Sequence, residues 1–237
     1  PKIEGMQVVA NTRNELDPKI HERKSKAQKI EMAGVSLSAF LREIAFDSDE
    51  VIITRVLHEH ARLRAVFVHP SAPFLTQRYK EDNRGGVENI QQLQLKSVEY
   101  CLRFYKKLET QYQNSFPYKG RYKPNGIVQI KLIDFCPHLT IERYDGDIYW
   151  GLYTSDTRGE QSPMFLVSMD SNYVIYDKLK NHFVALLNKH YDNEISNDDL
   201  YLIRMEAGEP WVNRKLFENL LGKEDVEKIL GKQDVKK

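Results

Sequence analysis

The sequence predicts an α/β domain over roughly residues 28–191, with short flanks at both ends. Residues 62–69 form an apolar run that stops at Pro70, as a buried strand does. Residues 87–112 carry apolar side chains at helical spacing, and residues 127–135 alternate as in a strand. The order along the chain is strand, helix, strand, helix, strand, then several strands and a helix. This order is typical of a sheet flanked by helices.

The remaining elements follow from the same kinds of pattern. In the flank 1–27, Asp17 and Pro18 predict the start of a helix, because Asp caps free N–H groups and Pro suits the first helical position. Asp47 or Ser48 is expected to cap a helix with apolar residues from 51 to 57. Strands are expected at 29–37, 139–144, 148–153 and 164–169, with a turn at 145–147, and helices at 176–191, 197–206 and 213–230. The segment 192–237 is therefore predicted to be a helical C-terminal extension.

Composition excludes several classes of protein. Lys and Arg number 35 against 34 Asp and Glu, so the near-neutral chain is not a binder whose whole surface attracts nucleic acid. Two cysteines make neither a disulfide framework nor a zinc site. No apolar run approaches the ~20 residues of a membrane span, and the start at Pro1 lacks an apolar signal region. We therefore expect a cytoplasmic protein, and such a start is typical of an excised part of a longer chain.

The most informative segment is residues 136–151, where a predicted strand, turn and strand carry polar groups. His138 lies seven residues before Asp145, and Gly151 follows Asp145 by six residues. Here the chain resembles a degenerate bacterial member of the phospholipase D superfamily, whose motif is H-x-K, four residues, then D. In that family one histidine attacks phosphorus, a second protonates the leaving oxygen, and the aspartate orients a histidine.

The match to this motif is incomplete. His138 and Asp145 align with the catalytic positions, whereas Thr140 stands where the family has its phosphate-binding Lys, and Leu152 stands where it has Ser. Without that cation, negative charge in a phosphoryl-transfer transition state would be poorly compensated. The resemblance also extends to the order of elements and to residues 28–37, 58–82 and 162–188. Together with the motif it covers a stretch of about 160 residues, from 28 to 188.

The resemblance implies a phospholipase-D-like mixed sheet flanked by helices, and a homodimer. Members of the family with one motif bring two histidines together across a two-fold axis. The expected packing surface near His138 is Phe135, Tyr149 and Trp150, whose alternative place is the core of the monomer. His138 itself has an alternative role as a structural residue at the start of a strand.

A loop at 114–126 interleaves aromatic side chains with cations. Such a composition suits contacts to phosphates together with base stacking. The alternative is an insertion held to the surface by its aromatic rings. The candidate phosphate or nucleic-acid contacts are Thr140, Lys119, Arg121, Tyr122 and Lys123.

Residues 6–46 also resemble a ribbon–helix–helix DNA-binding unit. Residues 6–12 would form its strand, 18–33 its first helix and 37–46 its second, with Gly34 and Ser36 as caps. This interpretation conflicts with a strand at 29–37, because one segment cannot be both.

The favoured hypothesis is a regulatory or sensor module with a degraded catalytic motif. It would bind a phosphate-containing ligand or nucleic acid with little or no catalysis, without a metal or other cofactor. One alternative is an active homodimeric phosphodiesterase or nuclease, and another is a ribbon–helix–helix regulator.

Overall fold

The computed structural model describes residues 5–47, 50–75, 87–117, 123–153, 162–188, 200–206 and 208–231. Within these residues, nine strands form one mixed sheet in the order β1-β7-β6-β5-β2-β3-β4-β8-β9. The strands are β1 (Met6–Ala10), β2 (Lys29–Gly34), β3 (Arg62–Val68), β4 (Ile127–Ile133), β5 (Leu139–Tyr144), β6 (Asp147–Leu152), β7 (Met164–Ser168), β8 (Tyr201–Glu206) and β9 (Glu209–Val212). The helices are α1 (Arg13–Lys26), α2 (Ser38–Phe46), α3 (Val51–His58), α5 (Val87–Ser115), α6 (Tyr173–Asn188), α7 (Arg214–Leu221) and α8 (Lys223–Leu230). The chain is thus an α/β domain built on a single sheet.

The centre of the sheet is parallel and its flanks are antiparallel. Strands β2, β3 and β4 run parallel, which requires crossover connections, and α2, α3 and α5 supply them. The strands β5, β6, β7 and β1 continue the sheet on one side, and β8 and β9 continue it on the other, all antiparallel to their neighbours. The carboxyl ends of the three parallel strands therefore lie at one edge, beside the amino end of β5.

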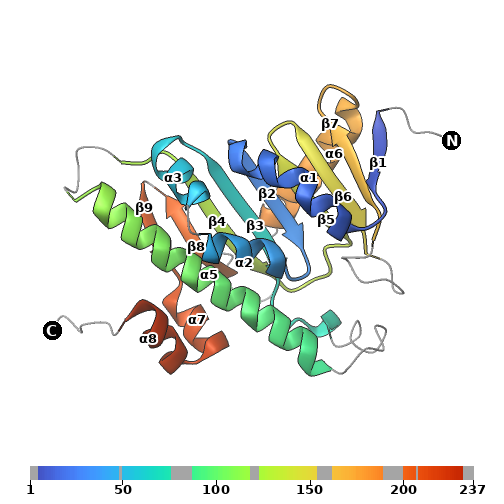
Figure 1. Cartoon of the computed structure of the whole chain (residues 1–237). Coiled ribbons are helices and arrows are strands. Elements are labelled where there is room, and N and C mark those ends of the chain that lie inside the picture. Colours follow the sequence, from blue (N-terminus) through green and yellow to red (C-terminus); the bar gives the residue numbers. More distant parts are fainter. Residues whose placement is uncertain are drawn as a thin grey trace.

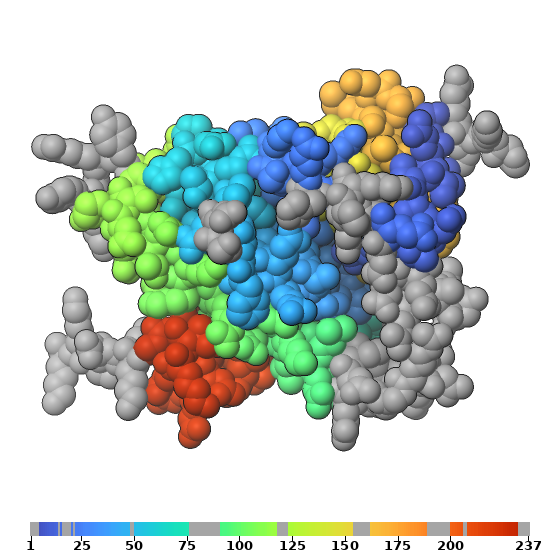
Figure 2. Space-filling model, in the orientation of Figure 1, coloured from blue at the N-terminus to red at the C-terminus, as the bar shows by residue number. Residues whose placement is uncertain are grey.

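Two apolar clusters cover the two faces of the sheet. The larger joins Met32, Phe67 and Leu132 to side chains of α1, α2, α3, α5, α7 and α8. The smaller joins Val66, Ile133 and Ile141 to α6. Figure 1 views the sheet from the many-helix side, with α6 behind it, and Figure 2 shows how fully the helices cover this side. The other side is covered by far less of the described chain.

Most of the element predictions are confirmed. The strands expected near 29–37, 62–69, 127–135, 139–144, 148–153 and 164–169 are β2 to β7, and the long helices at 87–112 and 176–191 are α5 and α6. The N-cap of α3 is Glu50 rather than the predicted Asp47 or Ser48, although the side chain of Asp47 accepts a hydrogen bond from the N–H of Val51 at 3.2 Å. The prediction of helix at 213–230 is met by α7 and α8, separated at Gly222.

Three local predictions are wrong. Helix α1 begins at Arg13, so Asp17 and Pro18 lie inside its range and do not start it. Residues 201–206 form β8 rather than a helix, because they pair with β4 at the edge of the sheet, so the segment after 192 is not wholly helical. The ribbon–helix–helix interpretation fails because β2 occupies 29–34, where its first helix would continue, and β1 pairs with β7 of the same chain.

None of the described helices is both long enough and apolar enough to cross a membrane.

Candidate functional site

The carboxyl edge of the parallel strands carries the histidine of the motif. His138 immediately precedes β5, and its side chain is exposed. Its backbone has φ of 51°, and its carbonyl accepts a hydrogen bond from the N–H of Tyr153 at 3.1 Å. A left-handed conformation is uncommon for a residue other than glycine. Open α/β sheets bind ligands beyond the carboxyl ends of their parallel strands, so His138 lies where such a site is expected.

The structure does not bring His138 and Asp145 together. The six residues of β5 lie between them, which places them at opposite ends of one strand, roughly 23 Å apart at ~3.3 Å per residue. The Asp145 carboxylate instead accepts hydrogen bonds from the N–H groups of Gln28 and Lys29, the latter at 2.8 Å. His138 and Asp145 of one chain therefore do not contact each other, because a strand separates residues seven apart. A catalytic role of His138 stays a prediction.

Thr140, at the position of the family's lysine, lies inside the protein. It is 1% exposed, it pairs with Gly151 across the β5–β6 hairpin, and its Oγ1 is buried with no hydrogen-bond partner. Its methyl group would lie 3.3 Å from a Cβ added at Gly151, so this part of the hairpin is closely packed. A ligand in solvent does not reach Thr140 in this conformation, which argues against the predicted phosphate contact.

A second histidine lies at the same edge. His69 follows β3, its N–H donates to the carbonyl of Ile133 at 2.7 Å, and its Nδ1 accepts from the N–H of Ser71 at 3.1 Å. Burial lowers the pKa of His69 below its usual value, and the nearby carboxylate of Asp134 offsets part of that effect. The bond to Nδ1 and the lowered pKa both favour a neutral imidazole with its proton on Nε2.

The two histidines are close enough to belong to one site. β5 and β3 both border β2, so the backbones at His138 and His69 are two strand spacings apart, about 10 Å. His69 is not among the site residues predicted from the sequence, although its position at the end of a buried strand is the signal that could have identified it.

The end of β2 between these histidines is held from two sides. The N–H of Val35 donates to the hydroxyl of Tyr153 at 3.1 Å, and the carbonyl of Val35 accepts from Nε2 of Gln94 at 2.9 Å. Gln94 is wholly buried, and its Oε1 has no hydrogen-bond partner. These bonds fix the floor of the site, because they anchor β2 to both β6 and α5.

Three of the predicted contact residues in the basic and aromatic loop lie outside the described residues. They are Lys119, Arg121 and Tyr122. Lys123 is described, and it is exposed and pairs with Glu209 of β9 at 3.6 Å. The described end of this loop therefore lies against the turn between β8 and β9, far along the sheet from β5.

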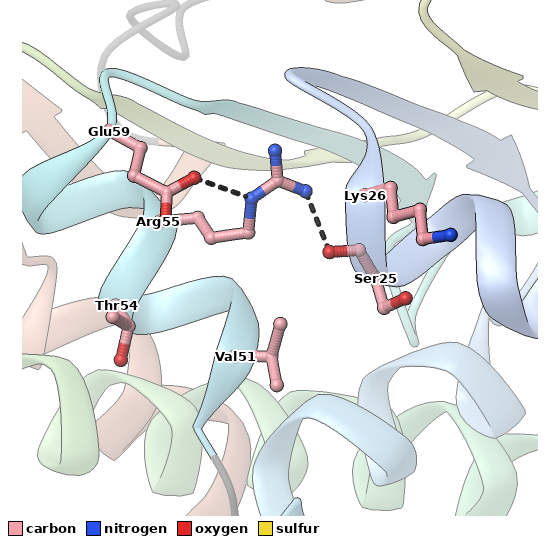
Figure 3. A pocket seen from close by; sticks show the side chains of 6 residues that line it. All are labelled: Ser25, Lys26, Val51, Thr54, Arg55 and Glu59. Atoms are coloured by element: carbon pink, nitrogen blue, oxygen red, sulfur yellow. Dashed lines mark hydrogen bonds and ion pairs between the residues drawn. The ribbon is translucent and has the colours of Figure 1, made fainter.

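Two surface hollows occur near the amino ends of the parallel strands. One has a volume of about 450 Å³ and lies between the end of α1 and α3 (Figure 3). In it the guanidinium of Arg55 donates to Glu59 at 3.0 Å and to the carbonyl of Ser25 at 2.7 Å. The strongest polar groups of this hollow are thus paired with each other, and Arg55 serves to close the end of α1.

The second hollow, of about 600 Å³, is lined by the β5–β6 turn and by the last turns of α1. Asp147 pairs with Arg23 there and also accepts from the hydroxyl of Ser168. Asp145 in the same hollow is bound by backbone N–H groups. These carboxylates therefore stabilise the fold at this end of the sheet.

Within the part of the chain that the structure describes, no group of three or more His, Cys, Asp or Glu side chains is placed to hold a metal ion. Comparisons with protein-family models, with curated proteins and with solved structures gave no match to this chain.

Proposed function

We propose that this chain is a phospholipase-D-like module that binds a phosphate-containing ligand beside His138 and turns it over slowly or not at all. The proposal includes the phospholipase-D-like form of the α/β fold. It is supported by the order of elements, in which three parallel strands with helical crossovers are followed by an antiparallel run and then by a helix.

The observation that carries the proposal is the contrast between His138 and Thr140. The histidine is exposed at the edge where α/β sheets bind ligands, whereas the side chain at the lysine position is buried and uncharged. The residues beyond the strand ends at this edge, 35–36, 69–71 and 134–138, include no Lys or Arg. An imidazole N–H can bind a phosphate oxygen, but without a neighbouring cation it gives little compensation for the charge of a transition state.

An NMR titration with inorganic phosphate tests the binding part. With the side chains of the seven histidines labelled, we expect the ring signals of His138 to move in a saturable way, and those of the distant His58 to stay in place. A His138→Ala variant assigns the signal. Unchanged His138 signals up to high phosphate concentrations would refute binding at this edge.

A turnover assay with bis(p-nitrophenyl) phosphate tests the catalytic part. We expect no hydrolysis above the level of the His138→Ala variant. Rapid hydrolysis that this variant abolishes would show a working phosphodiesterase instead.

One observation favours that second candidate. His69, neutral and beside Asp134, lies within two strand spacings of His138, so one chain holds two imidazoles at the same edge. If the chain is an active phosphodiesterase that uses both, His69→Asn should reduce hydrolysis as strongly as His138→Ala does. Loss with His138→Ala alone would assign the second histidine to another copy of the chain.

A further inference from the structure

A continuous row of side chains crosses the face of the sheet that α6 only partly covers. Residue pairing runs from Arg143 on β5 to Glu31 on β2, Arg64 on β3, Gln129 on β4, Arg204 on β8 and Trp211 on β9. Paired residues in adjacent strands point to the same face. This row therefore brings three arginines, one glutamate, one amide and one indole into line across six strands.

In the half of the row nearest α6, one carboxylate pairs with two arginines. The Glu31 carboxylate is 7% exposed, and it pairs with Arg143 at 2.6 Å and with Arg64 at 3.7 Å. The guanidinium of Arg143 also lies 5.4 Å from the ring centre of Tyr176, on α6. Beyond this point α6 ends over β4, where the buried Lys131 donates to the carbonyl of Leu187 at 2.8 Å. One carboxylate thus serves two arginines, which leaves the row with an excess of positive charge.

The other half of the row is basic and partly exposed. Arg64 is 23% exposed, whereas its Nε and the Oε1 of the neighbouring Gln129 are buried and have no hydrogen-bond partner. The next pair on the same face is Lys29 and Arg62, and both side chains are exposed. We call the surface formed by Lys29, Arg62, Arg64, Gln129, Arg204 and Trp211 the basic face.

Aromatic groups lie at the far end of the basic face. Trp211 is 44% exposed, and the guanidinium of Arg204 lies 4.9 Å from the centre of its ring and 4.3 Å from that of Tyr201. A guanidinium on one side of the indole holds the ring in place and leaves part of its surface for a further stacking partner. Among the described side chains near this face, the Asp145 carboxylate is bound by backbone N–H groups and Glu209 pairs with Lys123.

We propose that the basic face binds single-stranded nucleic acid. Phosphates would lie against Lys29, Arg62 and Arg64, and an unpaired base would stack on Trp211. Arginine and lysine supply the phosphate contacts, and an exposed indole beside them supplies a stacking platform for an unpaired base. Duplex bases are already stacked on each other, so the indole favours a single strand. This inference goes beyond the proposed function, because the basic face lies about five residues along each strand from the edge at His138.

Fluorescence of the full chain with an oligothymidine of about twenty nucleotides tests the proposal. The chain has two tryptophans, so a Trp150→Phe variant makes Trp211 the reporter of this surface alone. We expect saturable quenching of Trp211. We also expect Trp211→Ala to weaken binding of a labelled oligonucleotide about tenfold or more, whereas Trp211→Phe, which keeps a ring, retains most of the affinity.

Salt dependence tests the phosphate contacts. Arg62→Gln should lower the slope of log affinity against log salt concentration by about 0.7, the contribution of one phosphate on a single strand. The matched control is Arg42→Gln, which removes the same charge from an exposed position on α2, on the opposite face, and should leave the slope unchanged.

Three outcomes would overturn the proposal. One is no binding of the oligonucleotide at low salt. Another is equal weakening by Arg42→Gln and Arg62→Gln, which would show a general charge effect. The third is binding of the equivalent duplex, or of phosphatidylcholine vesicles with a quarter phosphatidylserine, at least as tightly as of the single strand. Because Trp211 reports this face alone, failure here is distinguishable from failure of the site at His138.

Discussion

At the scale of single residues, Asp145 contributes to the fold through its contacts with backbone groups. Its carboxylate joins the β5–β6 turn to the start of β2 through the N–H groups of Gln28 and Lys29, and its own backbone has φ of 53°. We expect Asp145→Ala to lower the free energy of unfolding by about 1–2 kcal/mol, because it removes both acceptors and puts alanine in the left-handed region.

Asp145→Asn is the matched control for that change. Asparagine keeps one side-chain oxygen as an acceptor and tolerates the left-handed region, so it should retain most of the stability. Unfolding in urea measures both variants. If Asp145→Ala were as stable as the wild type, the carboxylate would not be an anchor of the turn.

His69 predicts a dependence of stability on pH. Its pKa is lowered from the usual 6.5 by burial, with Asp134 offsetting part of the effect. Between pH 6.5 and the lower pKa that His69 has in the folded protein, the unfolded chain binds more protons than the folded one. His69 therefore contributes fully to the free energy of unfolding above pH 6.5. This contribution is lost as the pH falls toward the pKa of His69 in the folded protein.

A His69→Asn variant isolates this contribution, since its side-chain oxygen can accept from the N–H of Ser71 in place of Nδ1. We expect the stability of the wild type to fall more steeply than that of the variant between about pH 7 and pH 5 in urea unfolding. Parallel curves would show that His69 titrates normally.

At the scale of elements, local patterns predicted the strands that are buried or paired in hairpins. Strand β8 was missed because residues 200–203 are a short apolar run, and such a run fits a buried helix turn as well as a strand. What decides between them is pairing with β4, more than seventy residues away, which no local pattern contains. The separation of His138 from Asp145, in contrast, follows from the predicted strand at 139–144, because a strand extends by ~3.3 Å per residue.

The β8–β9 turn gives a test of how tightly this edge is joined to the domain. Gly208 has φ of 83°, and a Cβ there would lie 2.6 Å from Cβ of Lys123. Gly222 has φ of 89°, with nothing within 4 Å of its added Cβ. Both Gly→Ala changes introduce backbone strain, but only Gly208→Ala also forces the loop before β4 to move. We expect it to lower the free energy of unfolding by about 1 kcal/mol or more beyond the Gly222→Ala change in urea unfolding. Equal losses would mean that the loop adapts freely.

At the scale of the whole molecule, the charged row from Arg143 to Trp211 shows what the sequence alone could not predict. Its members come from six strands spread over 180 residues, and each looks like an ordinary alternating polar position in its own strand. Only the register of the assembled sheet places them in line. The same holds for His69 and His138, which share an edge because β2 lies between their strands.

The homodimer remains a prediction, and the structure changes where its contacts should be sought. Tyr149 is 4% exposed and belongs to the core, and Phe135 and Trp150 pack against the cluster under α6, so these residues are poorly placed for an interface. An exposed apolar side chain at the His138 edge is Leu152, which is 50% exposed at the end of β6, opposite Leu139. A two-fold axis beside Leu152 would bring His138 of two copies together.

Sedimentation of the 27.8 kDa chain at micromolar concentration tests this arrangement. We expect a dimer that Leu152→Glu converts to monomer, because a specific interface burying more than ~1,000 Å² does not tolerate a carboxylate near its centre. Val174→Glu, at a 64% exposed position at the opposite end of the sheet, should leave the dimer intact. If the wild type sediments as a monomer, two copies of the chain do not bring their His138 side chains together. His69 would then be the partner that a two-histidine mechanism requires within one chain.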